Sequence, residues 1–201
     1  MNFKKFVSIA LVSTIALGLL AGCGGPKKNA NVIQLGIIAE MTGNNASYGN
    51  SIANGAKMAA KELNAKGGLL GKQVEFVVAD TKSEPAESAN AMSKLVNQNK
   101  VPAVRGLCRA PGAIAAANVS EASKIPFLAV GATNPKVTVD DKSNKVKPNT
   151  YRVCFIDPFQ GTVGANFVAD TLKFKKAAIL IDNSSDYSKG LADCFKKAFA
   201  A

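Results

Sequence analysis

The chain has 201 residues, of which 47% are hydrophobic and 19% are charged, and its net charge is +11. This composition is typical of a globular protein and excludes a disordered or fibrous chain, and the length suffices for one domain and part of a second. The sequence contains no histidine, which excludes Ser-His-Asp and Cys-His catalytic sets and argues against a zinc site.

The first 22 residues have the layout of a secretory signal peptide. Lys4 and Lys5 form a basic region, and residues 6–20 are an apolar stretch that is too short for a convincing transmembrane helix. The tetrapeptide Leu20-Ala21-Gly22-Cys23 resembles the lipobox of bacterial lipoproteins, which predicts a lipid on Cys23. The alternative is an ordinary cleaved signal followed by a chance cysteine.

Residues 23–31 predict a flexible polar tether between this anchor and the folded part of the chain. Two or more acyl chains on the anchor would hold the protein stably at a bacterial membrane. We therefore expect an extracytoplasmic protein, in the periplasm or at the outer face of the cytoplasmic membrane. The remaining lysines are scattered and rarely interleaved with aromatic residues, so the charge predicts a surface facing anionic lipid and no nucleic-acid partner.

Strand and helix patterns alternate from residue 32 onward. Apolar and β-branched runs predict strands over 32–39, 74–79, 101–104 and 125–130. Helical spacing predicts helices over 50–66, from Pro85 through Val96, and up to Ser123. In the first of these helices, the expected buried face consists of Ile52, Ala56, Ala59 and Leu63. This alternation predicts an α/β fold with a doubly wound parallel sheet over residues 32–150.

The polar segment 139–150 predicts the exit from this first lobe. Beyond it, we expect an extended segment over 151–155 and a helix over 159–172 with Val163, Phe167 and Val168 facing inward. A fully buried strand over 177–181 and a helix from near Ser188 are predicted to follow. Residues 151–201 are fewer than half of a comparable lobe, so they predict an incomplete second α/β lobe.

Three cysteines remain after Cys23, namely Cys108, Cys154 and Cys194. An odd number leaves at least one thiol unpaired in an oxidising compartment. Cys154 and Cys194 are expected to be buried or half-buried thiols, and a bridge between them is the alternative. No CxxC pair occurs.

Four loops are predicted at one edge of the sheet, over 40–49, 106–112, 131–135 and 182–188. They are rich in small and polar residues, so they expose backbone N–H groups near helix N-termini, which suits a carboxylate or phosphate. Thr133 adds a hydroxyl donor.

Signals for an enzyme are weak in this sequence. The first strand is not followed by GxGxxG, and no GxxxxGK[ST] occurs. Asp80, Asp157 and Asp182 stand at the ends of predicted strands or extended segments. They are expected to cap helices or close turns rather than act as acid or base, since no matched nucleophile and base is present.

The sequence resembles the substrate-binding proteins of ABC transporters for branched-chain amino acids, of the leucine/isoleucine/valine-binding type with the periplasmic-binding-protein type 1 fold. The resemblance covers essentially the whole chain, as an N-terminal portion of the family length. It rests on these segments, in family order and spacing: IQLGIIAEMTGNNASYG, NGAKMAAKELNAKGGLLGKQVEFVVADTKSEP, ASKIPFLAVGATNP, YRVCFIDPFQG and DNSSDYSKGLA. It implies a receptor that binds a small amino acid between two lobes and delivers it to an ABC permease, without a cofactor, a metal or catalysis.

The resemblance also implies which residues bind the ligand. Gly131, Ala132 and Thr133 match the turn that holds the α-carboxylate. In the 106–112 loop, Ala110 stands where the family usually has a serine, and the adjacent Arg109 is either a compensating cation or a solvated arginine. The acidic side chain that usually meets the ammonium group lies further along than Ala201.

Two tyrosines complete the predicted site. Tyr48 matches an aromatic position that lines the pocket, and its alternative role is to fix its loop against the following helix. Tyr187 matches the aromatic residue that packs on the ligand after the lobes close, and the alternative is an exposed loop tip.

Three other functions stay open at this stage. The first is a sensory or non-transport module that binds amides, urea or another small carboxylate. The second is a truncated fragment without function, and the third is an enzyme with an unrecognised catalytic set.

Overall fold

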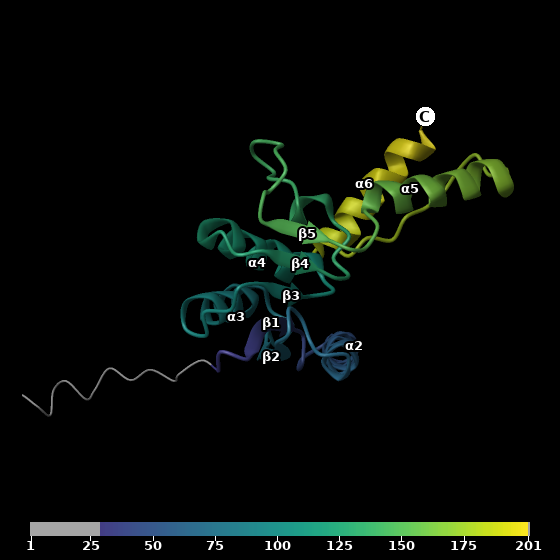
Figure 1. Ribbon diagram of the computed structural model, residues 1–201. Helices are drawn as coiled ribbons and strands as arrows, with labels where there is room; N and C mark the ends of the chain where they lie inside the picture. The colour runs from purple at the N-terminus through teal and green to yellow at the C-terminus, as the bar shows by residue number, and fades with distance from the viewer. Residues whose placement is uncertain (1–28, 201) are drawn as a thin grey trace, which may run out of the picture. The chain divides into compact units, whose positions relative to one another are not determined.

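The computed structural model of the protein describes residues 29–200, and the predicted signal peptide and Cys23 lie outside them. Strands and helices alternate over the first part of the described chain (Figure 1). In order they are β1 Val32–Ala39, α2 Ala46–Ala65, β2 Gln73–Asp80, α3 Pro85–Asn97, β3 Val104–Gly106, α4 Ala110–Ser123, β4 Phe127–Ala129, the 3₁₀ turn η1 Pro135–Val137 and β5 Thr150–Arg152. The helices α5 Asp157–Asn166, η2 Phe167–Thr171 and α6 Asp186–Phe199 follow.

The five strands form one sheet in the order β2-β1-β3-β4-β5. The pairs β1–β3, β3–β4 and β4–β5 are parallel, with Gly36 opposite Val104 and Val104 opposite Phe127. The predicted parallel α/β architecture is therefore confirmed. Strand order reverses between β1 and β3, and in such sheets a ligand crevice forms beyond the carboxyl ends of the strands at that point.

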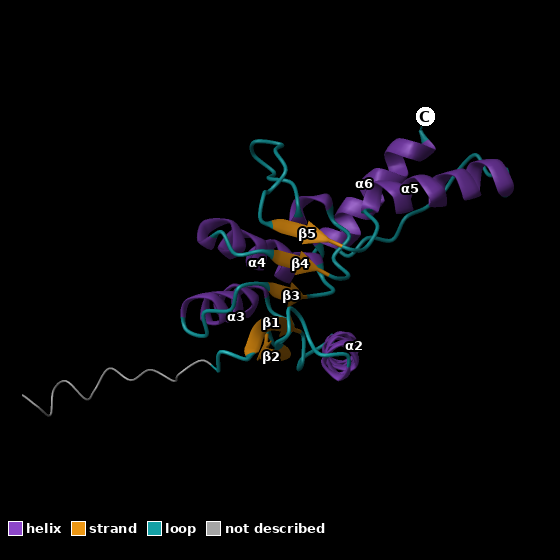
Figure 2. Cartoon of the chain, viewed as in Figure 1, coloured by secondary structure: helices purple, strands orange, loops and turns teal. Residues whose placement is uncertain are grey.

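Helices cover both faces of this sheet, with α3 and α4 on one side and α2 on the other (Figure 2). Ile38 and Phe127 pack with Leu95 on the α3–α4 side, whereas Ile37 packs with Ala53 on the α2 side. Fully burying each large apolar side chain contributes roughly 1.5–3 kcal/mol. The helices packed on the two faces therefore hold the sheet, and with it the carboxyl ends of its strands, in place.

The buried face of α2 consists of Gly49, Ala53, Ala56 and Ala60. Of the predicted face, Ala56 is buried as expected, whereas Ala59 and Leu63 are exposed and Ile52 is half-buried, so the prediction was wrong at these three residues. The reason is close approach, because a β-carbon on Gly49 would collide with the backbone of Glu40. Only small side chains fit at such a contact.

The third strand begins at Val104 rather than at the predicted Val101. Pro102 has no N–H group to donate to a ladder, so regular pairing starts after it. Val101 is instead buried beside α3, where its N–H donates to Leu95 O at 3.2 Å.

The segment after residue 150 differs most from the sequence prediction. β5 joins the first sheet, so the predicted boundary at residue 150 falls within a strand, and the division into two lobes stays a prediction. In α5 the buried residues are Asp157, Gly161 and Ala165, whereas Val163 and Phe167 are exposed. The predicted inward face was therefore wrong at Val163 and Phe167, whereas Val168 is half-buried. Gly161 lies against Cys194 of α6, since a β-carbon there would come within 2.7 Å of that side chain.

The predicted strand over 177–181 is absent from the described chain, and this prediction was wrong. Residues 177–181 have no regular secondary structure, and Leu180 is 100% exposed. A fully buried strand needs paired neighbours and two covered faces, and the sheet of the described residues ends at β5.

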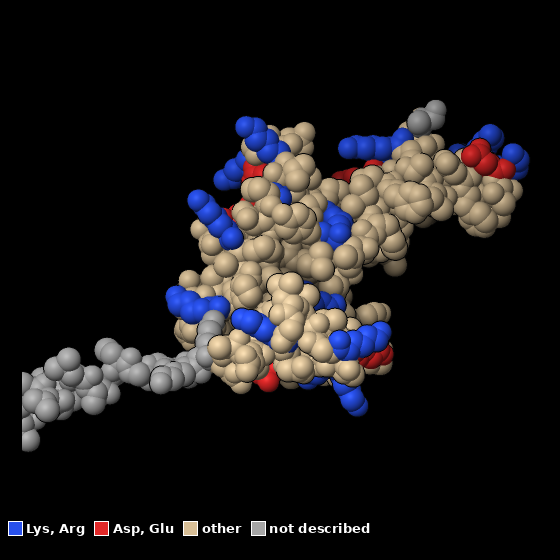
Figure 3. Space-filling model, viewed as in Figure 1, with Lys and Arg blue, Asp and Glu red and all other residues tan. Residues whose placement is uncertain are grey.

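Charged side chains are spread unevenly over the surface. On the face seen in Figure 3, lysine and arginine are scattered over several helices and loops, and a broad uncharged surface covers the α5–α6 region. Within residues 29–200, no helix has both the length and the apolar character needed to cross a bilayer.

Candidate functional site

The first wall of the site is fixed by a buried carboxylate. Glu40 follows β1 and is 2% exposed. Its carboxylate accepts hydrogen bonds from the N–H groups of Cys108 at 3.2 Å and Arg109 at 3.3 Å. The 106–112 loop was expected to expose its N–H groups to a ligand anion, but at these two residues the protein's own carboxylate accepts them. The 106–112 loop is therefore held in place from β1.

The second wall is the turn after β4, and Arg152 orients it. The guanidinium of Arg152 donates to the carbonyl oxygens of Ala132 and Asn134, both at 3.0 Å, and of Pro135 at 3.2 Å. It also donates to Thr138 Oγ1 at 2.6 Å. The carbonyl groups of this turn therefore face Arg152. No acceptor within residues 29–200 is paired with the N–H groups of Ala132 and Thr133.

The two walls touch at Gly131. Its N–H donates to Leu107 O at 3.2 Å, and a β-carbon on this residue would come within 3.0 Å of Cys108 Cα. A larger residue would push the turns apart. Glycine at this position therefore allows the loops after β3 and β4 to lie side by side.

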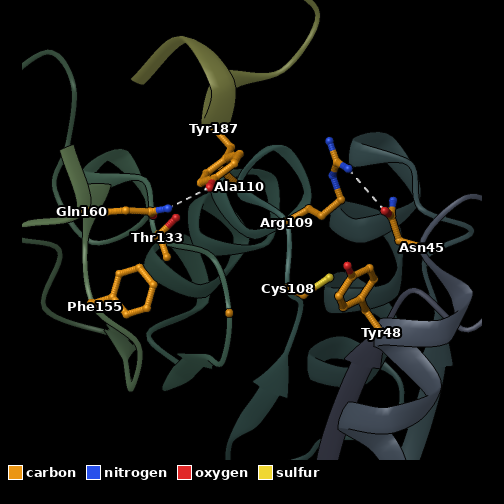
Figure 4. A pocket seen from close by; sticks show the side chains of 10 residues that line it. Asn45, Tyr48, Cys108, Arg109, Ala110, Thr133, Phe155, Gln160 and Tyr187 are labelled. Carbon is orange, nitrogen blue, oxygen red and sulfur yellow. Dashed lines mark hydrogen bonds between the residues drawn. The ribbon is translucent and has the colours of Figure 1, made fainter. Parts of the chain in front are cut away.

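A pocket of about 400 Å³ opens where these loops meet the start of α6. It is lined by Asn45, Tyr48, Cys108, Arg109, Ala110, Gly131, Thr133, Phe155, Gln160 and Tyr187 (Figure 4). Six of the seven residues singled out from the sequence therefore share one cavity. The seventh, Ala132, is 1% exposed and lies behind the wall. Thr133 is 8% exposed.

Two hydrogen bonds join residues that line the pocket. Arg109 Nη1 donates to Asn45 Oδ1 at 3.2 Å, and Gln160 Nε2 donates to the Tyr187 hydroxyl at 3.3 Å (Figure 4). Arg109 is thus an exposed cation tied to the first loop. Tyr48 is also largely exposed, which leaves its ring free on the pocket side.

Four lining residues were missed by the sequence analysis, namely Asn45, Cys108, Phe155 and Gln160. Phe155 and Gln160 belong to the segment YRVCFIDPFQG, which carried the resemblance but was given no site role. Asn45 lies in the first loop without a distinguishing pattern. Their place in the pocket depends on contacts between loops that are far apart in the chain.

The thiols near the site are poor nucleophiles. Burial and the adjacent Glu40 carboxylate raise the pKa of Cys108 to about 12, so little thiolate exists at neutral pH. Burial also raises the pKa of Cys154 and of Cys194. All three are free thiols in the described chain, so the alternative bridge between Cys154 and Cys194 is absent from this structure.

Two of the strand-end aspartates close turns, as expected. Asp80 accepts hydrogen bonds from the N–H groups of Met41 and Thr42 and from the Thr42 hydroxyl, which fixes the start of the first loop. Asp182 accepts from the N–H and hydroxyl groups of Ser184. Over residues 29–200, no group of three or more cysteine, aspartate and glutamate side chains is placed to hold a metal ion.

Comparison with known proteins decides the family. A model of the family described as periplasmic binding protein matches residues 32–201. The chain belongs to the periplasmic binding protein family. It is 33% identical over 197 residues to the Leu/Ile/Val-binding protein BraC3 of Rhizobium johnstonii, covering 98% of this chain and 50% of that protein.

Two solved periplasmic binding proteins of similar fold carry the same architecture. One is the branched-chain amino acid transporter substrate binding protein LivJ from Streptococcus pneumoniae in complex with isoleucine, at 36% identity and a TM-score of 0.76, covering 84% of this chain and 47% of that chain. The other is the leucine binding protein LivK from Thermotoga maritima, at 34% identity and a TM-score of 0.75, covering 84% and 45%. This periplasmic binding protein chain thus spans about half the length of the curated relatives it matches.

Proposed function

We propose that the protein is a solute receptor that captures a small aliphatic amino acid (leucine, isoleucine or valine) and presents it to the permease of an ABC transporter. One observation carries the proposal. Thr133, with its hydroxyl and unengaged N–H group, and Arg109, with its guanidinium, line one pocket whose walls also include the aromatic side chains of Tyr48, Phe155 and Tyr187. Such a pocket suits a ligand with a carboxylate at one end and an apolar group at the other. The names of the relatives, Leu/Ile/Val-binding protein among them, support the same ligand class.

In this mechanism the two sides of the pocket have different tasks. The 131–133 turn holds the carboxylate with N–H and hydroxyl donors, and Arg109 replaces the donor that is lost where Ala110 stands. Tyr187 and Gln160 approach from the helices that follow β5 and cover the side chain. Hinged approach of these helices toward the sheet would then enclose the ligand and create the form that a permease recognises.

The receptor would work outside the cytoplasm, held at the membrane by a lipid on Cys23. Labelling of cells with an alkyne fatty acid should mark the protein and should fail for Cys23→Ala. Unchanged labelling of that variant would contradict the anchor, without bearing on ligand binding.

Calorimetric titration tests the ligand and the role of each of its ends. We expect heat with leucine, isoleucine or valine and none with 3-methylbutylamine, which keeps the aliphatic group but lacks the carboxylate. Thr133→Val should weaken leucine binding about 10- to 100-fold, since a hydrogen bond to a charged group contributes roughly 1.5–3 kcal/mol. Thr162→Val, on the exposed side of α5, is the matched control and should bind as the wild type does.

Other outcomes identify the alternatives. Heat with propionamide or urea but none with leucine would indicate a receptor for amides. No heat with any ligand, together with proteolysis after about residue 150, would indicate a fragment without a binding function. Equal leucine affinity of Thr133→Val and wild type would contradict the proposal that the 131–133 turn binds the ligand carboxylate.

A further inference from the structure

We propose that Asp157 is a positioning residue that decides whether the Thr133 hydroxyl donates a hydrogen bond into the pocket or accepts one. The proposal rests on the function proposed above, in which Thr133 contacts the ligand carboxylate. Asp157 itself does not line the pocket, so it acts only through Thr133.

Asp157 lies directly behind Thr133. It is the first residue of α5 and is 0% exposed. Its N–H donates to Thr133 O at 3.1 Å, which ties the start of α5 to the turn. Neither carboxyl oxygen has a hydrogen-bond partner among the described residues, and the Thr133 hydroxyl acts to lower the pKa of this group. A buried carboxyl without a fixed partner is costly in its charged form.

The packing around this carboxyl group is tight. A β-carbon on Gly190 of α6 would come within 3.3 Å of Asp157 Oδ2 and within 2.8 Å of Asn134 Nδ2. Asn134 in turn donates to Asp186 O at 2.9 Å. The 133–134 turn, the start of α5 and the first turns of α6 therefore converge on Asp157.

Few charged groups face Asp157 from these segments. The guanidinium of Arg152 is committed to the carbonyl oxygens of the 131–135 turn. The thiols of Cys154 and Cys194 are neutral at physiological pH, because their pKa values are raised. On α6, Asp186 and Lys189 form an ion pair with each other at 3.2 Å. No lysine or arginine side chain within residues 29–200 forms an ion pair with Asp157.

The protonation state of Asp157 would set the direction of a hydrogen bond that its carboxyl group forms with the Thr133 hydroxyl. Burial raises the pKa of Asp157, and the Thr133 hydroxyl and Arg152 only partly oppose this. A neutral Asp157 can donate its proton to Thr133 Oγ1, which leaves the Thr133 proton free for a ligand carboxylate. An ionised Asp157 accepts that proton instead, and Thr133 then presents a lone pair to the ligand. Affinity for a carboxylate should therefore fall as the pH rises through the pKa of Asp157.

The direct test follows Thr133 in the ligand-free wild-type protein. We expect the NMR shifts of the Thr133 methyl and amide groups to titrate with a midpoint above the ordinary aspartate range near 3.9. Asp157→Asn should lose this titration, because the amide keeps the shape and a donor but cannot ionise. Asp170→Asn, an exposed aspartate in η2, is the control and should keep it. If the Thr133 signals of the wild type do not titrate, the proposal is overturned. This measurement uses the wild-type protein alone, so it does not depend on whether a variant folds.

Leucine titration over about pH 4 to 8 tests the consequence. The wild type should lose about tenfold or more in affinity across the Thr133 midpoint, whereas Asp157→Asn should hold its affinity. A wild-type affinity that is independent of pH across this midpoint would overturn the proposed link between the two residues. If Thr133 titrates but leucine does not bind at any pH, the proposed ligand is wrong and the positioning role of Asp157 stands.

Discussion

The strand region, residues 32–152, and the helical region, residues 153–200, bury their apolar side chains very differently. In the strand region Ile37, Ile38 and Phe127 are completely buried, whereas in the helical region Phe174 is largely exposed and Leu180 fully so. Apolar composition is similar in both, so it does not explain the difference. The strand region has a sheet with helices on both faces, while α5 and α6 pack mainly on each other. Burial therefore follows from the number of packed layers.

Both regions nevertheless contribute to the pocket. The strand region supplies rigid donors at Thr133 and Arg109, and the helical region supplies Phe155, Gln160 and Tyr187. Binding residues on a well-packed scaffold are held accurately, and those on a weakly packed part can move. We therefore expect the first set to capture the ligand and the second to adjust around it.

Truncating one large side chain in each region should give the greatest contrast. Phe127→Ala should lower the free energy of unfolding by about 3–5 kcal/mol, because it leaves a cavity in the core. Leu180→Ala should change it by less than about 0.5 kcal/mol, since this side chain is fully exposed. Urea unfolding followed by circular dichroism measures both. Equal losses would mean that residues 177–181 are buried in solution.

Arg152 lies at the end of the strand region and orients the 131–135 turn, so its removal should give the next largest effect. Arg152→Met leaves three carbonyl oxygens and one hydroxyl without their donor, which should cost about 1–3 kcal/mol of unfolding free energy. Leucine affinity should fall as well, because the 131–135 turn loses its orientation. Arg109→Met is the control for stability and should stay within about 0.5 kcal/mol. A stable Arg152→Met protein with normal affinity would show that the turn holds its shape without the guanidinium.

Acid sensitivity should distinguish the strand region from the helical region. Burial disfavours the charged form of Asp80, but hydrogen bonds from the Thr42 hydroxyl and from the N–H groups of Lys82, Thr42 and Met41 outweigh it and lower its pKa. A lowered pKa stabilises the fold above the unfolded-state value, and this contribution is lost as the pH falls through the folded-state value. Asp80→Asn should therefore reduce stability at pH 7 and flatten its loss toward pH 3, as measured by urea unfolding.

Asp182 is the matched control for this measurement. Hydrogen bonds from Ser184, two residues away, lower its pKa, and such a local contact can persist in the unfolded chain. Asp182→Asn should therefore change the pH dependence much less than Asp80→Asn does. If the two variants change the pH dependence of stability equally, Asp182 must also have tertiary contacts that are lost on unfolding.

Glycine substitution should give the smallest effects, with opposite signs. Gly55 in α2 has open space around it, so Gly55→Ala should stabilise the protein by up to about 1 kcal/mol. A β-carbon on Gly161 would meet Cys194 and the Phe195 backbone at 2.7 Å, so Gly161→Ala should destabilise the α5–α6 contact. Thermal unfolding together with amide exchange in α6 measures both. Stabilisation by Gly161→Ala would mean that α5 and α6 do not pack closely in solution.

Local sequence signals predicted most of the strand region. The β-branched run over 32–39 and Pro85 at a helix start lie where the patterns placed them, because each depends on nearby residues and on backbone chemistry. Six of the seven residues that the family resemblance implied as ligand contacts line one pocket. The pattern of small and polar residues after buried strands predicted only the loops that carry them, because such residues mark the carboxyl edge of a parallel sheet. The Glu40 carboxylate on the Cys108 and Arg109 amides was not foreseen, because these residues are 68 and 69 positions apart in the chain.

The sequence by itself determined the alternation of strands and helices and the edge of the sheet at which small polar turns gather. Both depend on periodicity and turn chemistry, which are local properties of the chain. Tertiary structure alone decided which face of α2 is buried, that residues 177–181 stay unpaired, and that Asp157 lies behind Thr133. These outcomes depend on how closely distant backbones approach and on which neighbours are present, and a linear pattern of residue types does not contain that information.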